Sequence, residues 1–218
     1  MASESGEAES AKPLRLSAFR RRDALVDAAA ALVSAGDVHD VYMEAVAERA
    51  GVSRPLVYKH FANRHDLLAA VYRREVVRVH DELAAEVAAA GTVEEMFRAL
   101  VRGSLRAAAE RGQLFTALRA AGAWSRQLRE EQRTRDRDTV RAFGARSVRQ
   151  FGLDRRLAMS LTAVLLGALD SVLIQWRLRP TEENAALLEQ VYMTTVTGAY
   201  AAMRASAEAS PALAGRPT

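Results

Sequence analysis

The residue types best suited to chemistry are concentrated in the stretch GVSRPLVYKHFANRHDLL, residues 51–68. Its cationic and polar aromatic side chains are Arg54, Tyr58, Lys59, His60 and Arg64. No Asp or Glu occurs from residue 49 to residue 65, although a solvated surface normally carries charges of both signs. Lys and Arg neutralise phosphates. The stretch therefore indicates a negatively charged partner such as a nucleic acid.

The residue patterns of an enzyme site are missing from the sequence. It has no cysteine, and its four histidines are His39, His60, His65 and His80. Five residues turn an α-helix by about 140°, so His60 and His65 do not share a face that could hold a metal. The sequence also lacks a G-x-S-x-G motif, a phosphate-binding loop with its lysine and a dinucleotide-binding glycine pattern. We predict a protein that is not an enzyme and that uses no cofactor or metal.

Two short helices, at about 43–50 and 54–61, are expected to hold the cationic stretch. Gly51 can adopt the left-handed conformation that ends the first helix. Ser53 can cap the second helix, and Pro55 falls in its first turn, where a missing N–H costs nothing. Two short helices joined by such a glycine-containing turn are typical of a helix-turn-helix.

The second of these helices has two unlike faces. Val57 and Phe61 are four residues apart and are expected to be buried, whereas Arg54 and Tyr58 share another face. The residues that flank this second face are Leu56, Lys59 and His60. Such a helix fits the major groove of DNA, about 12 Å wide, with its first residues at the base edges.

The rest of the chain shows no strand pattern and is also expected to be helical. A helix is expected from near Ser17 to Gly36, ahead of the cationic stretch. Thr92 with Glu95 three residues later is a capping-box pattern, and Gly112 is expected to break the helix that follows. The helices expected after the cationic stretch are 64–89, 93–110, 113–121, 124–150, 154–178 and 182–206.

These patterns divide the chain into a disordered polar and basic arm, a helix-turn-helix domain, a larger helical domain and a flexible tail. Their expected bounds are 1–16, 17–66, 67–207 and 208–218. The basic run at 12–22 can insert into a minor groove, as the arms of some DNA-binding proteins do. The alternative is a solvated tail that assists binding without sequence preference.

Residues 157–176, LAMSLTAVLLGALDSVLIQW, are long and apolar enough to span a membrane. Asp170 lies in this stretch, and a carboxylate deep in a bilayer is costly, so a helix buried in a soluble protein is the favoured interpretation. The first ten residues are small and acidic rather than apolar. We therefore expect a cytoplasmic protein with no membrane partner.

The segment VAERAGVSRPLVYKHFANRHDLLAAVY, residues 46–72, closely resembles the tetracycline-repressor (TetR) family of bacterial transcription regulators. The resemblance extends back through RRDALVDAAAALVSAG and covers roughly residues 20–72. It implies an all-α fold in which an N-terminal three-helix helix-turn-helix domain is followed by a helical bundle for ligand binding and dimerisation. It also implies a repressor that binds a pseudo-palindromic operator as a homodimer and is released by a small-molecule effector.

The resemblance also implies roles for individual residues. The residues expected at bases or the groove floor are Arg54, Pro55, Leu56 and Tyr58, and those expected at phosphates are Tyr58, Lys59, His60 and Arg64. Tyr42 stands where the family usually has Thr or Ser, and its own hydroxyl can substitute as the phosphate contact. Glu44 replaces a base-contacting Arg of some members, and Leu56 replaces a frequent Thr. The operator sequence therefore cannot be taken from any relative.

The larger domain carries no motif, and its expected roles follow from the resemblance. The last two helices are expected to form the dimer interface, with a seam at Leu188, Tyr192, Thr195, Ala199 and Ala202, whose spacing is 4-3-4-3. The alternative is that these residues pack only within the chain. The candidate ligand contacts are Phe97, Phe115, Trp124, Phe143, Asp170 and Trp176, each of which can equally be ordinary core. The competing function is a ligand-independent DNA-binding or architectural protein, which would have no hollow in the bundle.

Overall fold

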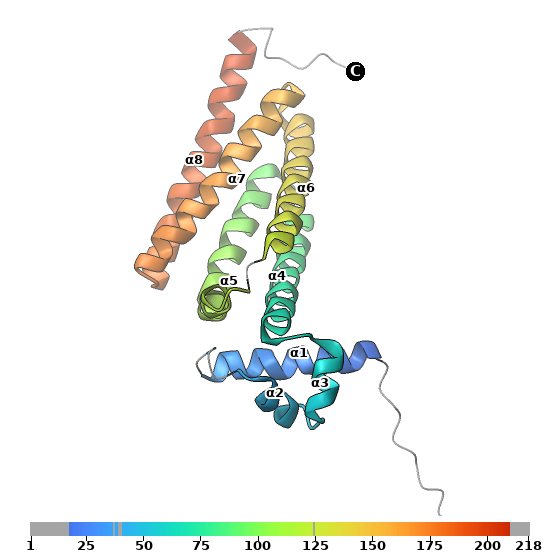
Figure 1. Ribbon diagram of the computed structural model, residues 1–218. Coiled ribbons are helices and arrows are strands. Elements are labelled where there is room, and N and C mark those ends of the chain that lie inside the picture. Colours follow the sequence, from blue (N-terminus) through green and yellow to red (C-terminus); the bar gives the residue numbers. More distant parts are fainter. Residues whose placement is uncertain (1–17, 37, 39–40, 124, 210–218) are drawn as a thin grey trace, which may run out of the picture. The chain divides into compact units, whose positions relative to one another are not determined.

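Eight helices make up the regular structure of the computed structural model, which describes residues 18–36, 38, 41–123 and 125–209 (Figure 1). No strand occurs within these ranges, and the predicted all-α fold is confirmed. The chain divides into two units, residues 1–67 and 68–218. The predicted arm at 1–16 and most of the predicted tail at 208–218 lie outside the described residues.

The first unit holds a three-helix head. Its helices are α1 (Ala18–Ala35), α2 (Met43–Arg49) and α3 (Arg54–His60). Gly51 has φ +64° in the turn between α2 and α3, a conformation that glycine adopts without a Cβ penalty. The Val52 N–H then donates to the Ala47 carbonyl at 2.9 Å. The predicted helix-turn-helix is thus formed by a turn that uses the backbone conformation expected of Gly51.

The core of the head lies between its helices. Val57 is fully buried and Phe61 is 3% exposed, as their four-residue spacing predicts, and Val46 packs into the same small core. The Arg22 guanidinium lies 4.8 Å from the centre of the Phe61 ring, where a cation is attracted to the ring face. One prediction is wrong, because Ser53 occupies the N-cap of α3 but makes no side-chain capping hydrogen bond.

The second unit is a helical bundle. The helices that build it are α4 (Arg64–Ala88), α5 (Val93–Ala120), α6 (Arg126–Phe151), α7 (Arg155–Leu178) and α8 (Glu182–Ala209). Thr92 and Glu95 form the predicted capping box at the start of α5. The predicted break at Gly112 is wrong, because α5 continues through it to Ala120. A glycine inside a helix costs only about 1 kcal/mol, which the packing of a long helix outweighs.

The core of the bundle is centred on aromatic side chains from α5, α6 and α8. The ring of Phe97 lies 4.9 Å from that of Phe143 and is fully buried. Tyr200 brings a hydroxyl into this core and shares hydrogen bonds with Ser147 at 2.7 Å and with Thr162 at 3.2 Å. Three hydroxyl groups from α6, α7 and α8 therefore satisfy one another in a place that excludes water.

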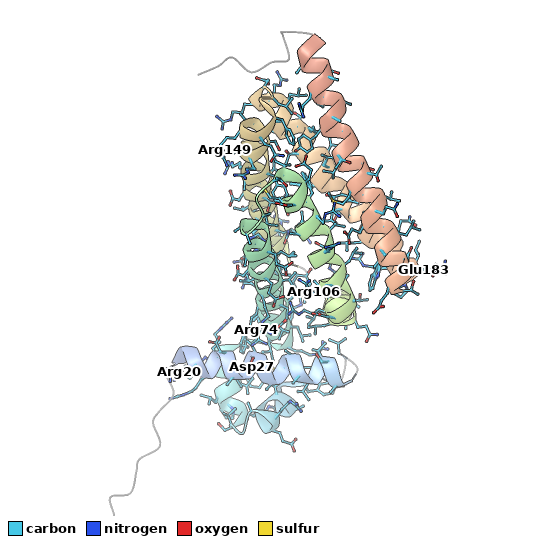
Figure 2. All side chains as sticks on the ribbon, turned by 180° about the vertical axis from the view of Figure 1, so that it is seen from behind. Arg20, Asp27, Arg74, Arg106, Arg149 and Glu183 are labelled. Atoms are coloured by element: carbon cyan, nitrogen blue, oxygen red, sulfur yellow. The ribbon has the colours of Figure 1, made fainter. Side chains whose placement is uncertain are left out.

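Ion pairs connect α4 to its neighbours in the bundle. Arg111 of α5 donates to both carboxylate oxygens of Glu82 at 2.9 Å. Arg106 of α5, labelled in Figure 2, pairs with Glu86, and Arg73 makes a two-bonded pair with Glu131 of α6 at 2.9 and 3.0 Å. From residue 76 to residue 88 no residue of α4 is buried. Partly exposed ion pairs thus contribute much of the attachment of this half of α4.

Helices α7 and α8 pack side by side and leave an apolar face uncovered (Figure 1). Val164, Ile174 and Leu178 of α7 are 70%, 52% and 75% exposed, and Leu187 and Val191 of α8 are more than half exposed. By length and composition α7 is the one described helix that could cross a membrane, and only 22% of its most apolar window is buried in the single chain. The near-complete burial expected for 157–176 is therefore absent from the single chain.

The seam expected on α8 contains both buried and exposed residues. Tyr192 is buried, and its hydroxyl donates to the Leu165 carbonyl at 2.9 Å, so this residue belongs to the chain's own core. Thr195 and Ala202 are exposed. The exposed residues of α8 that follow a 4-3-4-3 spacing are Leu187, Val191, Thr194, Gly198 and Ala201. We define these residues together with Val164, Gly167, Ser171, Ile174 and Leu178 of α7 as the α7–α8 face.

Replacing Tyr200 with Phe tests the buried hydroxyl network. The change keeps the ring but removes the hydroxyl that pairs with Thr162, and we expect the free energy of unfolding to fall by about 1–3 kcal/mol. Urea unfolding followed by circular dichroism measures it. Tyr42→Phe is the matched control, because the Tyr42 side chain is 57% exposed, and a change there should stay within about 0.5 kcal/mol. Equal stability of Tyr200→Phe and wild type would contradict the network's role.

Candidate nucleic-acid interface and ligand cavity

Helix α3 presents its polar residues on an exposed face. Arg54 and Lys59 are exposed and Tyr58 is 43% exposed, while Val57 on the opposite side is fully buried. The helix contains no acidic residue. Short, amphipathic and positively charged, α3 can enter the major groove of a duplex while its apolar side stays attached to the head.

Glu44 of α2 holds Arg54 in place across this surface. One carboxylate oxygen of Glu44 lies 2.7 Å from a terminal nitrogen of Arg54, although both side chains are more than half exposed. The same guanidinium lies 5.5 Å from the centre of the Tyr58 ring and 3.5 Å from its hydroxyl. Hydrogen bonding to Tyr58, and then the charge of Glu44, raises the pKa of Arg54 above its ordinary value. Arg54 is therefore a fixed cation that Glu44 orients and partly neutralises.

The other predicted DNA contacts differ in exposure. Tyr42 and Pro55 are exposed, whereas Leu56 and His60 are half-buried. Tyr42 occupies the N-cap of α2 without a side-chain capping bond, so its hydroxyl does not replace the usual cap. The phosphate contact predicted for Tyr42 stays a prediction.

Arg64, also predicted as a phosphate contact, has a structural role that the sequence did not indicate. Its Nε donates to the Val41 carbonyl at 2.8 Å, and a terminal nitrogen donates to the Val38 carbonyl. The side chain is half-buried. Arg64 therefore fastens the first turn of α4 to the segment between α1 and α2, and any phosphate contact would have to use the remaining donors.

Two of the residues nominated for ligand binding lie away from the cavities described here. Phe97 is fully buried in the aromatic core. Asp170 was expected to be a buried acid but is exposed, because α7 turns that side out of the bundle. Phe115, Phe143 and Trp176 each line a different hollow, and Trp124 lies outside the described residues. The nominated set therefore does not form one site.

A cavity of about 390 Å³ lies between α4, α5 and α7, and we call it the Ser104 cavity. Its apolar wall consists of Val79, Leu83, Ala107, Ala108, Phe115 and Leu173. The polar side chains around it are Tyr72, Ser104, Thr116, Arg119 and Arg177. This volume is in the usual range for small-molecule sites, about 300–1,000 Å³, as is the mixture of an apolar wall with a few polar groups.

A second hollow of about 440 Å³, the α4–α6 groove, lies over the first turns of α5. Leu83 lines both hollows. Arg146 and Arg149 lie at one end of the groove on α6 (Figure 2 labels Arg149), and Arg146 donates to the Gly91 carbonyl. Sequence reasoning found neither hollow as a unit, because each combines small and apolar residues that are unremarkable along the chain.

Comparison with known proteins finds a family match for the N-terminal part of the chain. Residues 25–71 match the family described as bacterial regulatory proteins, tetR family. The transcriptional regulator BetI of Rhizobium meliloti (strain 1021) is 38% identical over 87 residues, which cover 40% of this chain and 43% of BetI. The match thus spans less than half of that relative's length.

Solved structures extend the likeness to the whole fold. A crystal structure of a protein from Pseudomonas aeruginosa PAO1 superposes with a TM-score of 0.68 at 19% identity, covering 88% of this chain and 96% of that one. The regulator FadR from Bacillus subtilis, solved in complex with stearoyl-CoA, superposes with a TM-score of 0.58 at 17% identity, covering 79% and 95%. At these identities the likeness establishes a shared fold.

Replacing Glu44 with Gln tests whether this acid restrains Arg54. The change removes one negative charge beside the cationic face, and we expect affinity for random-sequence duplex DNA at low salt to rise by about threefold to tenfold. Fluorescence anisotropy with a labelled duplex measures it. Glu48→Gln is the matched control, because Glu48 is an exposed acid on the same helix with no ion pair to a described residue. An equal rise in DNA affinity in Glu44→Gln and Glu48→Gln would show a general effect of removing negative charge. It would contradict a specific restraint of Arg54 by Glu44.

Proposed function

We propose that the chain, whose residues 25–71 match the tetR family of bacterial regulatory proteins, is a sequence-specific DNA-binding regulator of transcription. The observation that carries this proposal is the exposed, acid-free face of α3, with Arg54, Tyr58 and Lys59 on a helix anchored by Val57. Arg54 and Tyr58 would meet base edges, and Lys59 and His60 would meet phosphates. The protein would act in the cytoplasm and would perform no catalysis.

We propose that the active form is a homodimer joined through the α7–α8 face. Val164, Ile174 and Val191 are each more than half exposed on this face, and soluble proteins rarely leave such a patch uncovered. Gly198 and Ala201 are small and would let the helices of two copies approach closely. A two-fold dimer presents two heads to successive major grooves, whose centres are about 34–36 Å apart, so the operator would be a pseudo-palindrome.

The regulator would repress by occupying its operator and would be released by a small molecule in the Ser104 cavity. Helix α4 supports this proposal, because its first turn is bonded to the head through Arg64 while Tyr72, Val79 and Leu83 of the same helix line the cavity. A ligand that fits one position of α4 better than another would change the affinity for DNA. The hollow itself argues against the ligand-independent alternative. FadR, which shares the fold, binds stearoyl-CoA in its crystal.

Replacing Arg54 with Ala should weaken binding to the preferred operator by about tenfold to hundredfold, the usual effect of losing a side chain that reads a base. Binding to random-sequence duplex should fall much less, so the ratio of the two affinities falls as well. Both affinities are measured by anisotropy at one salt concentration. Arg137→Ala, an exposed cation on α6, should change neither affinity. An unchanged ratio in Arg54→Ala would remove α3 from the proposed recognition surface.

Replacing Ile174 with Asp should dissociate the dimer, because a carboxylate would be buried in an apolar interface. We expect the dimer dissociation constant, measured by sedimentation equilibrium, to rise by at least about a hundredfold. Val77→Asp is the control, since Val77 is an exposed apolar residue (39%) on α4. A wild-type chain that is monomeric, or that fractionates with membranes through α7, would contradict the proposed interface.

A further inference from the structure

Ser104 places a hydroxyl in the wall of the Ser104 cavity. The residue is only 9% exposed and lines the cavity, and its hydroxyl exchanges no hydrogen bond with any described residue. By contrast, Thr116 and Ser147 donate to the carbonyl four residues earlier at 2.8 and 2.9 Å. A hydroxyl that faces a cavity can both donate a hydrogen bond to a bound molecule and accept one from it. Its position indicates a hydrogen-bonding group on a bound molecule.

Positive charge marks another part of the same cavity. The Nε of Arg119 donates to the Tyr72 hydroxyl at 3.0 Å, and the guanidinium lies 5.9 Å from the centre of the Tyr72 ring. Arg177 of α7 also lines the cavity. None of the described residues that line it carries a carboxylate. The two cations therefore favour an anionic group of a ligand over a neutral or positive one.

The wall between Ser104 and Arg119 is apolar. These residues are fifteen positions apart on α5, about 22 Å at the rise of an α-helix. The side chains that fill the interval include Leu83, Ala108, Phe115 and Leu173. Gly112 lies midway, and a Cβ built there would meet nothing within 4 Å.

We propose that the Ser104 cavity binds an elongated amphipathic anion that carries a second polar group. Its anionic head, a carboxylate or a chemically similar group, lies against Arg119 and Arg177. Its apolar body lies along α5 past Gly112, and an oxygen at its far end exchanges a hydrogen bond with Ser104. Long-chain carboxylates with a terminal hydroxyl or carbonyl have this chemistry. That such a ligand controls DNA binding rests on the proposed function, whereas its binding to the cavity does not.

Calorimetric titration of the full-length protein without DNA tests the head group and the far oxygen separately. The probes are dodecanol, dodecanoate and ω-hydroxydodecanoate, with hexadecanoate and ω-hydroxyhexadecanoate as the longer pair. We expect dodecanoate to bind at least about tenfold more tightly than dodecanol. For the carboxylate whose length fits the cavity, we expect the ω-hydroxy acid to bind about threefold to tenfold more tightly than the acid without the hydroxyl. Dodecanoate that binds no more tightly than dodecanol would overturn the assigned head group. An ω-hydroxy acid that binds no more tightly than its parent in both chain lengths would overturn the role of Ser104.

Substitutions test which residues of the cavity contact each end of the ligand. Arg177→Gln, and Arg177→Gln combined with Arg119→Gln, should weaken carboxylate binding and leave dodecanol binding unchanged. Ser104→Ala should abolish the preference for the ω-hydroxy acid while keeping affinity for the parent acid. Gly112→Leu should reduce the affinity for every probe by filling the cavity. Arg133→Gln, an exposed cation on α6, is the charge control. A preference that survives Ser104→Ala, or carboxylate binding that survives both arginine changes, would contradict the assignment.

A second measurement separates this proposal from the regulatory one. The probe with the highest affinity is added to the protein–operator complex, and release is followed by anisotropy. Binding without release would support the ligand chemistry and contradict the effector role. Operator binding by a protein that takes none of the anions would contradict the ligand chemistry and leave the proposed DNA-binding function standing. Thermal unfolding of each variant confirms that it remains folded before its affinity is compared.

Discussion

Helix α4 runs without a break from Arg64 to Ala88, and the regulation proposed above depends on this single helix. Its first turn is fixed by hydrogen bonds from Arg64 to the carbonyls of Val38 and Val41. Tyr72 and Leu83 on the same helix line the Ser104 cavity.

The second half of α4 contacts the bundle through partly exposed side chains rather than through buried ones. No residue from 76 to 88 is buried, and ion pairs such as Arg111–Glu82 and Arg106–Glu86 contribute to the contact with α5. Partly exposed ion pairs contribute about 0–1 kcal/mol each, within reach of the binding energy of a small ligand. The core around Phe97 and Tyr200 is held by buried rings and hydroxyls instead, and it provides the fixed frame.

Local chemistry made the helix-turn-helix and the helix starts predictable from sequence. Thr92 with Glu95, and Gly51 in its turn, act on their immediate neighbours and need no tertiary information. Gly112 was misjudged because the packing of a long helix outweighs the cost of one glycine. The burial of Tyr192 was not predictable, because Leu187 stands beside Leu188 and Val191 beside Tyr192, and hydrophobicity alone cannot tell which of two adjacent faces turns inward. The place of Ser104 in a cavity depends on residues of α4 and α7, and the pairing of Glu44 with Arg54 depends on the packing of α2 against α3. Neither can be predicted from the local sequence.

The measurement that tests the central claim most directly is selection of bound fragments from random-sequence duplex DNA by the full-length protein, followed by sequencing. A two-fold dimer with α3 in the major groove predicts enrichment of one pseudo-palindrome whose half-sites are about one helical turn, or a multiple of it, apart. Salt-sensitive binding to every duplex without enrichment, or enrichment of a single half-site only, would contradict a dimeric sequence-specific regulator.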